Sequence, residues 1–254
     1  MSRFASKALS LPWRRNSVVH LDIGRSRILL QHGQSTIRHE LPFPIDSCLP
    51  GVESLTQLGC AIETLGAGIL HERQTVEITL SDALTRCWIL ERLPGLASPR
   101  EIDGLAYDQM QQIYGDTAAD TAHWVVQVDA APFANRWPAI ALARTLLDLL
   151  CAMAETQGWH LGKIQTRFVR GFNACSSQSI RQPAQAIYWL ESSDGLTIGI
   201  RNAREWQALR THPPLTLLGS DLQAMLRRDC RAIGLQIANC QVQPLHWPVK
   251  RQGR

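Results

Sequence analysis

Two similar three-strand segments lie about 170 residues apart in this chain of 254 residues, and this repeat constrains the fold most strongly. Residues 18–41 have the pattern strand, acidic turn, strand, short turn, strand. Residues 186–209 repeat that pattern, with turns at Asp194-Gly195 and Asn202-Ala203. A duplicated meander predicts two equivalent lobes that face each other across a cleft. The alternative is that two unrelated hairpins merely resemble one another, since short strand patterns carry little information.

The remaining segments mix helical and strand periodicity, which predicts an α/β (α+β) fold with mixed sheets. The best-defined helix begins at Ser98, because a serine cap, a following proline and Glu101 three residues later are typical of a helix start. We expect this helix to end at Gly115. Other helices are expected at 55–70, 139–157, 168–174 and 221–232, and other strands at 76–80, 87–90, 123–128, 161–164, 215–218 and 236–242.

The formal charge of +4 is concentrated at the two ends of the chain. Residues 1–16 carry four basic residues and no acid, and residues 249–254 carry three more. The body between them is therefore mildly acidic, at −3. A folded basic face for nucleic acid is not expected, and the basic ends are expected to act as tails that rest against anionic lipid.

Seven scattered cysteines without a CxxC pair are typical of reduced thiols in a cytoplasmic protein. No apolar run reaches about 18 residues, so no membrane-spanning helix is expected. The histidines have no metal-ligand spacing, and no nucleophile motif is present, so we expect neither a metal site nor catalytic residues. Trp13, Trp137 and Trp247 lie near prolines, where exposed aromatic side chains would anchor a partner.

Three stretches together resemble one protein family: Leu21–Ser26, the strand pair at 76–80 and 86–94, and residues 158–164 after a long helix. The family is the actin-like superfamily, and within it the PilM-type and GspL-type proteins of bacterial type IV pilus and type II secretion machinery. The resemblance implies a duplicated, ribonuclease H-like fold. Its expected parts are a basic tail (1–16), a first lobe with an inserted strand-helix subdomain (17–180), a reduced second lobe (181–247) and a second basic tail (248–254).

The resemblance also implies where a nucleotide would bind. In nucleotide-binding members an acid orients magnesium-bound water, a glycine lets the backbone approach phosphate, and a hydroxyl holds phosphate oxygens. Asp22, Gly24 and Ser26 match these roles in the first lobe, for ATP with Mg²⁺ as the cofactor. The alternative interpretation is that Asp22 caps a turn and Gly24 merely permits it.

The second lobe departs from the family pattern in three places. Asp194-Gly195 is explained by a hairpin turn alone, and the adenosine-binding glycine pair is reduced to residues 217–220. Only a few residues separate the end of the second meander near Leu209 from Leu215, where ATP-binding members insert a helical subdomain. A base bound here would keep one face in water. We therefore expect a degenerate ATP site without useful hydrolysis, and no cofactor.

The leading hypothesis is a non-catalytic cytoplasmic scaffold of a pilus or secretion assembly platform, peripheral to the inner membrane. The resemblance implies binding to the cytoplasmic tail of an inner-membrane assembly protein, and an assembly ATPase as a second partner. One alternative is a nucleotide-binding actin-like ATPase of the same family. The other is a nucleic-acid-binding or regulatory protein that uses the basic tails.

Overall fold

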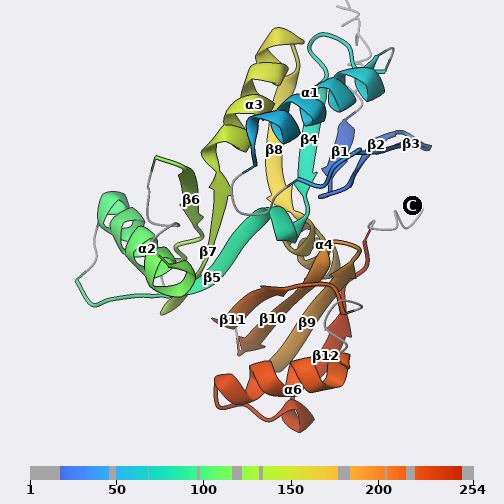
Figure 1. The fold of residues 1–254 in the computed structure, drawn as a ribbon. Coiled ribbons are helices and arrows are strands. Elements are labelled where there is room, and N and C mark those ends of the chain that lie inside the picture. The colour runs from blue at the N-terminus through green and yellow to red at the C-terminus, as the bar shows by residue number, and fades with distance from the viewer. Residues whose placement is uncertain are drawn as a thin grey trace, which may run out of the picture.

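A computed structural model describes residues 18–45, 50–67, 69–95, 98–115, 122–131, 134–176, 184–203, 205–215 and 221–247. The first lobe is built on a five-stranded sheet of order β3-β2-β1-β4-β8 (Figure 1). Its strands are β1 (Val19–Ile23), β2 (Arg27–His32), β3 (Ser35–Glu40), β4 (Thr75–Leu80) and β8 (His160–Thr166). The first three form the expected antiparallel meander, and β4 runs parallel to both β1 and β8.

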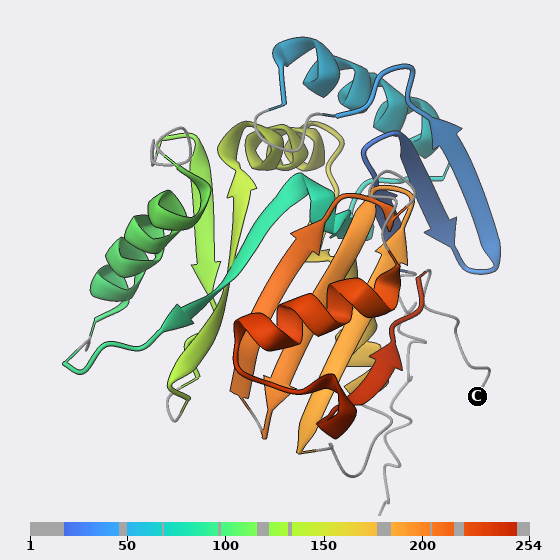
Figure 2. The same ribbon diagram turned by 60° about the horizontal axis from the view of Figure 1, so that its bottom comes forward.

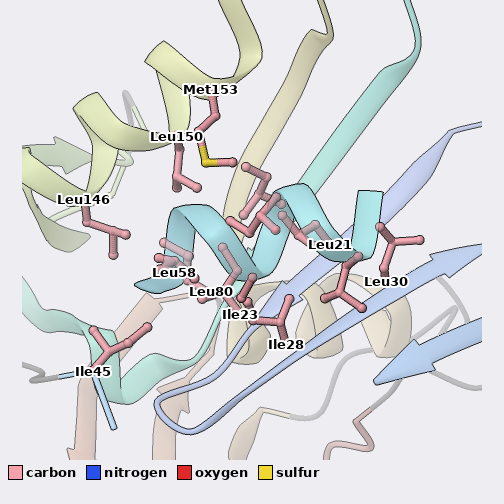
Figure 3. Packing of buried hydrophobic residues seen from close by; sticks show 14 of the residues in the cluster. Leu21, Ile23, Ile28, Leu30, Ile45, Leu58, Leu80, Leu146, Leu150 and Met153 are labelled. Atoms are coloured by element: carbon pink, nitrogen blue, oxygen red, sulfur yellow. The ribbon is translucent and has the colours of Figure 1, made fainter. Parts of the chain in front are cut away.

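Helices α1 (Val52–Gly66) and α3 (Arg144–Thr156) share one hydrophobic core with this sheet. Figure 3 shows Leu21 of β1, Leu58 of α1 and Leu150 of α3 converging in that core. The buried residues of α1 recur at helical spacing, which is the periodicity that predicted the helix. This packing holds β1 in the middle of the sheet, so that the end of β1 is fixed in position.

A second, smaller sheet of order β5-β7-β6 lies beside the first lobe. It consists of β5 (Thr85–Glu91), β6 (Trp124–Val128) and β7 (Arg136–Ala143), and helix α2 (Pro99–Tyr114) covers one of its faces. The helix begins as expected at Ser98, whose hydroxyl accepts from the Glu101 N–H at 3.3 Å while the Glu101 carboxylate accepts from the Ser98 N–H at 2.9 Å.

The expected helix over 139–157 is wrong in its first five residues, because residues 136–143 form strand β7 and the helix begins at Arg144. Every second residue of β7 is buried, including Trp137, Ala139 and Ala141, which is the period of a strand. The run is rich in alanine, which has a high helix propensity, so the local sequence favoured a helix over the correct strand. Likewise the strand expected over 236–242 is a short 3₁₀ turn, Ile237–Asn239, followed by β12 (Gln241–Pro244).

The second lobe repeats the central part of the first. Its sheet has the order β11-β10-β9-β12, with β9 (Gln185–Ser192), β10 (Gly195–Asn202) and β11 (Glu205–His212). The meander is antiparallel and β12 runs parallel to β9, as β4 runs parallel to β1. Helix α6 (Leu222–Ala232) covers one face. The four strands of this sheet thus match β3-β2-β1-β4 of the first sheet in order and direction, which confirms the predicted duplication.

Helix α4 (Arg167–Ser176) connects β8 to the second lobe and lies between the two lobes (Figure 1). The inserted subdomain also contacts the second lobe, because β5 and β7 lie against β11 (Figure 2). There the Asn135 N–H donates to Glu205 Oε1 at 3.0 Å, and Cys87 Sγ lies 3.4 Å from Thr211 Oγ1. The two lobes are therefore joined at two places. No helix among the described residues is long and apolar enough to cross a membrane.

Candidate functional site

The acidic turn of the first lobe lies where the two lobes meet. Asp22 is in β1 and is nearly fully buried, and the Gly24 N–H donates to the Arg27 carbonyl at 2.8 Å to close the turn. A Cβ on Gly24 would lie 2.8 Å from Arg167 Nη2 and 2.9 Å from Asp194 Oδ2. Gly24 is therefore required for close approach of another group, as the sequence suggested, but that group belongs to the protein itself.

The equivalent turn of the second lobe brings Asp194 to the same place. This buried residue lies between β9 and β10, and its Oδ2 accepts from the Arg25 backbone N–H at 3.2 Å. Asp194 N–H donates to the Ser192 hydroxyl at 3.2 Å, which fixes the turn. The interpretation of Asp194-Gly195 as a hairpin turn is correct but incomplete, because the carboxylate also reaches across to the first lobe.

Arg167, the first residue of α4, lies between these two acids. Its Nε donates to Asp22 Oδ1 at 2.9 Å and its Nη1 donates to Asp194 Oδ2 at 2.9 Å, and its side chain has 0% exposure. Burial alone would raise the pKa of Asp194, but the adjacent guanidinium and hydrogen bonds lower it below its usual value. We call Arg167 with Asp22 and Asp194 the Arg167 bridge.

The second carboxylate oxygen of Asp22 accepts a hydrogen bond from the C-terminal segment. Trp247 Nε1 donates to Asp22 Oδ2 at 2.6 Å, and the Arg170 guanidinium lies 5.2 Å from the centre of the Trp247 ring. Trp137 is buried with 3% exposure. The expectation that Trp137 and Trp247 are exposed partner anchors is therefore wrong, because one fills the core beneath α2 and the other holds Asp22. Trp13 lies outside the described residues.

A third acid fixes the start of α4 and therefore the position of the bridge. Both carboxylate oxygens of the buried Asp82 accept from the Phe168 N–H, at 3.1 and 3.2 Å, while the Thr166 hydroxyl accepts from the Val169 N–H at 3.3 Å. Burial raises the pKa of Asp82 to about 6, although these hydrogen bonds and the nearby Arg167 oppose the rise. The first backbone N–H groups of the helix are thus satisfied from inside the fold.

These contacts engage the carboxylates that would otherwise face a nucleotide and its Mg²⁺. Asp22, which the resemblance assigns to magnesium-bound water, is bound to the Arg167 guanidinium, and so is Asp194. Ser26 is the third expected site residue. Its backbone carbonyl accepts from the Leu41 N–H at 2.7 Å, which holds the residue in position. Within the described ranges, no group of three or more His, Cys, Asp or Glu side chains could hold a metal. The residues do not fit the cofactor, and residues 217–220 lie outside the described part.

An apolar groove of about 480 Å³ lies on the uncovered face of the small sheet. It runs between β6 and β7 on one side and β8, α4 and β11 on the other, and its lining ranges from buried to exposed side chains. The apolar residues on its two walls include Val125, Pro138, Ile140, Ile164, Val169 and Phe172. No sequence pattern predicted the groove, because its lining residues come from eight separate elements.

No protein-family model and no curated protein matches the sequence. Among solved structures, the chain matches one described as "PilM-PilN type IV pilus biogenesis complex", with a TM-score of 0.56, 11% identity, and coverage of 85% of this chain and 70% of the other. The chain has an actin-like fold. This is the fold that the resemblance implied.

Two further structures match over most of their length. The cytoplasmic domain of EpsL, an inner-membrane component of the type II secretion system of Vibrio cholerae, matches with a TM-score of 0.48 and 11% identity, over 94% of this chain and 90% of that one. A protein of Bacteroides thetaiotaomicron with an actin-like ATPase fold and unknown function matches with a TM-score of 0.46 and 8% identity, over 90% and 91%. At these identities the likeness concerns the fold.

Proposed function

We propose that this protein is a non-catalytic scaffold of a pilus or secretion assembly platform, located on the cytoplasmic side of the inner membrane. In this role it binds the cytoplasmic tail of an inner-membrane partner. The observation that carries the proposal is the Arg167 bridge, because it places a protein cation between the two turns that would otherwise face a nucleotide. The fold it shares with a pilus biogenesis complex supports the setting.

A nucleotide would have to displace the bridge before it could bind. Arg167 would leave a fully buried position, and breaking such a pair while its acids remain buried costs about 3–5 kcal/mol. At about 1.4 kcal/mol for each tenfold change, this cost lowers affinity by about two to three and a half orders of magnitude. Only nine residues, 213–221, join β11 to α6, fewer than the helical subdomain that ATP-binding members insert there would need. Both features favour a scaffold over an ATPase.

The apolar groove is the proposed site for the partner's tail. Strand β6 lies at an edge of its sheet and lines the groove, so an extended peptide could pair with β6 while its apolar side chains enter the groove. The PilM structure that this fold matches is itself a complex with PilN, which supports a protein partner.

Site-specific crosslinking in the native host tests this proposal. A photoreactive amino acid at position 125, on the groove, should crosslink to a membrane-anchored protein through the residues that precede its membrane span. The matched control is position 113 on α2, where Ile113 is 54% exposed but lies outside the groove. Crosslinks from position 125 only to soluble proteins, or the same products from both positions, would contradict the proposal.

A further inference from the structure

The outer side of helix α6 carries a cluster of arginines. Figure 2 shows α6 lying across the sheet of the second lobe. Its apolar side chains, including Met225 and Leu226, are buried against that sheet, whereas Arg227, Arg228 and Arg231 are exposed. Arg210 of β11 lies beside them with its side chain 41% exposed. We call these four arginines the arginine face.

A buried carboxylate beneath the helix holds part of this face in place. Asp229 has a fully buried side chain, and it accepts from Arg210 Nη1 at 3.2 Å and from His212 Nε2 at 2.8 Å. Arg228 Nε lies 3.7 Å from the same carboxylate. Two of the four guanidinium groups are therefore anchored on their inner side, while much of each side chain stays in solvent. Their position is more defined than that of ordinary surface arginines.

The composition of the surface indicates the chemistry of its partner. The other exposed residues of α6 are Gln223, Ala224 and Ala232, so this helix offers no exposed aromatic or large aliphatic side chain. Protein interfaces depend on such buried anchors, and a face without them does not favour a protein partner. Guanidinium groups bind phosphate oxygens well. The body of the chain between its tails is acidic, so a nucleic acid longer than α6 would meet negative charge beside the arginine face. This disfavours nucleic acid as the partner.

We propose that the arginine face binds the phosphate groups of an anionic phospholipid bilayer. The helix would lie flat against the headgroups, with its apolar side still buried in the protein. The proposal deepens the scaffold function, since it gives the second lobe a membrane-facing side, and it rests on that function for its biological setting. Its measurement needs no partner protein, so its failure can be told apart from failure of the scaffold proposal.

Vesicle binding by the full chain tests the proposal. The probes are vesicles of phosphatidylcholine alone and vesicles with about one third phosphatidylglycerol, in about 0.1 M salt. The variant R227Q/R231Q removes two arginines that do not contact Asp229. The matched control R73Q/R100Q removes two exposed arginines outside α6, Arg73 in the turn before β4 and Arg100 in α2, with the same change in net charge. Circular dichroism establishes that both variants fold.

We expect the chain to bind the anionic vesicles and not the neutral ones. R227Q/R231Q should lower the partition coefficient about 30-fold, which corresponds to about 1 kcal/mol for each arginine, and R73Q/R100Q should lower it less than threefold. The basic tails are present in every variant, so they do not affect this ratio. Equal losses in the two variants, equal binding to neutral vesicles, or tighter binding to a short DNA duplex at the same salt would overturn the proposal.

Discussion

Replacement of Arg167 by methionine should strongly destabilise the protein. The substitution keeps much of the side-chain volume but removes the guanidinium that donates to both Asp22 and Asp194 at 2.9 Å. Both acids have below 8% exposure, so they would remain buried without their counter-ion. Leaving a buried charge unpaired costs about 3–5 kcal/mol, and we expect Arg167→Met to lower the free energy of unfolding by that amount.

A triple variant separates this charge effect from a packing effect. Asp22→Asn, Arg167→Met and Asp194→Asn together remove all three charges, while the amide oxygens can still accept from Trp247 and from the Arg25 N–H. Neutral replacement of a buried ion pair is often nearly neutral for stability, so the triple variant should recover most of the loss.

The assay is urea unfolding at pH 7, followed by tryptophan fluorescence and circular dichroism, with the free energy obtained by linear extrapolation. The two signals should change together if the two lobes unfold as one unit. A loss below about 1 kcal/mol in Arg167→Met, or a triple variant as unstable as the single one, would refute the reasoning that the bridge is a tightly coupled buried ion pair.

Three further predictions concern the surroundings of the bridge and helix α2. Gly24→Ala places a Cβ 2.8 Å from a guanidinium nitrogen and should lower the free energy of unfolding by about 1–3 kcal/mol. At Gly104 a Cβ meets nothing within 4 Å, so Gly104→Ala should stabilise α2 by up to about 1 kcal/mol. Urea unfolding of both variants checks this. The folded-state pKa of Asp82 is raised to about 6, so its stabilising contribution is full below about pH 4 and is lost as pH rises through 6. Between pH 4 and pH 7 the free energy of unfolding of the wild type should fall by up to about 3 kcal/mol more than that of Asp82→Asn. The same change with pH in both proteins would contradict this. Ser98→Ala should cost about 1 kcal/mol in thermal unfolding, while Glu101→Gln, which keeps the capping-box acceptor, should cost much less.

The parts of the fold that were predicted correctly depend on local signals. The two meanders follow from turn residues and alternating apolar residues, and the start of α2 follows from its capping box. Residues 139–143 of strand β7 favour a helix locally, because its buried positions are mostly alanines, whose preference opposes the structure that tertiary packing imposes.

The candidate site was only half predictable for a related reason. Asp22 and Gly24 stand out in the sequence because they lie in a recognisable turn, whereas Arg167 does not, because its partners lie 145 and 27 residues away in the sequence. A single arginine after a strand is ordinarily a surface charge. The local sequence feature that sets Arg167 apart is its position at the start of a helix, directly after strand β8. The groove and the role of Trp247 depend on contacts between distant segments in the same way.

Calorimetric titration of the full chain with magnesium-ATP tests the central claim, that the Arg167 bridge occupies the place of the nucleotide phosphates. We predict no saturable binding in the micromolar range. A micromolar dissociation constant that Asp22→Ala abolishes would contradict the account, because it would mean that the bridge opens readily and that Asp22 serves a nucleotide.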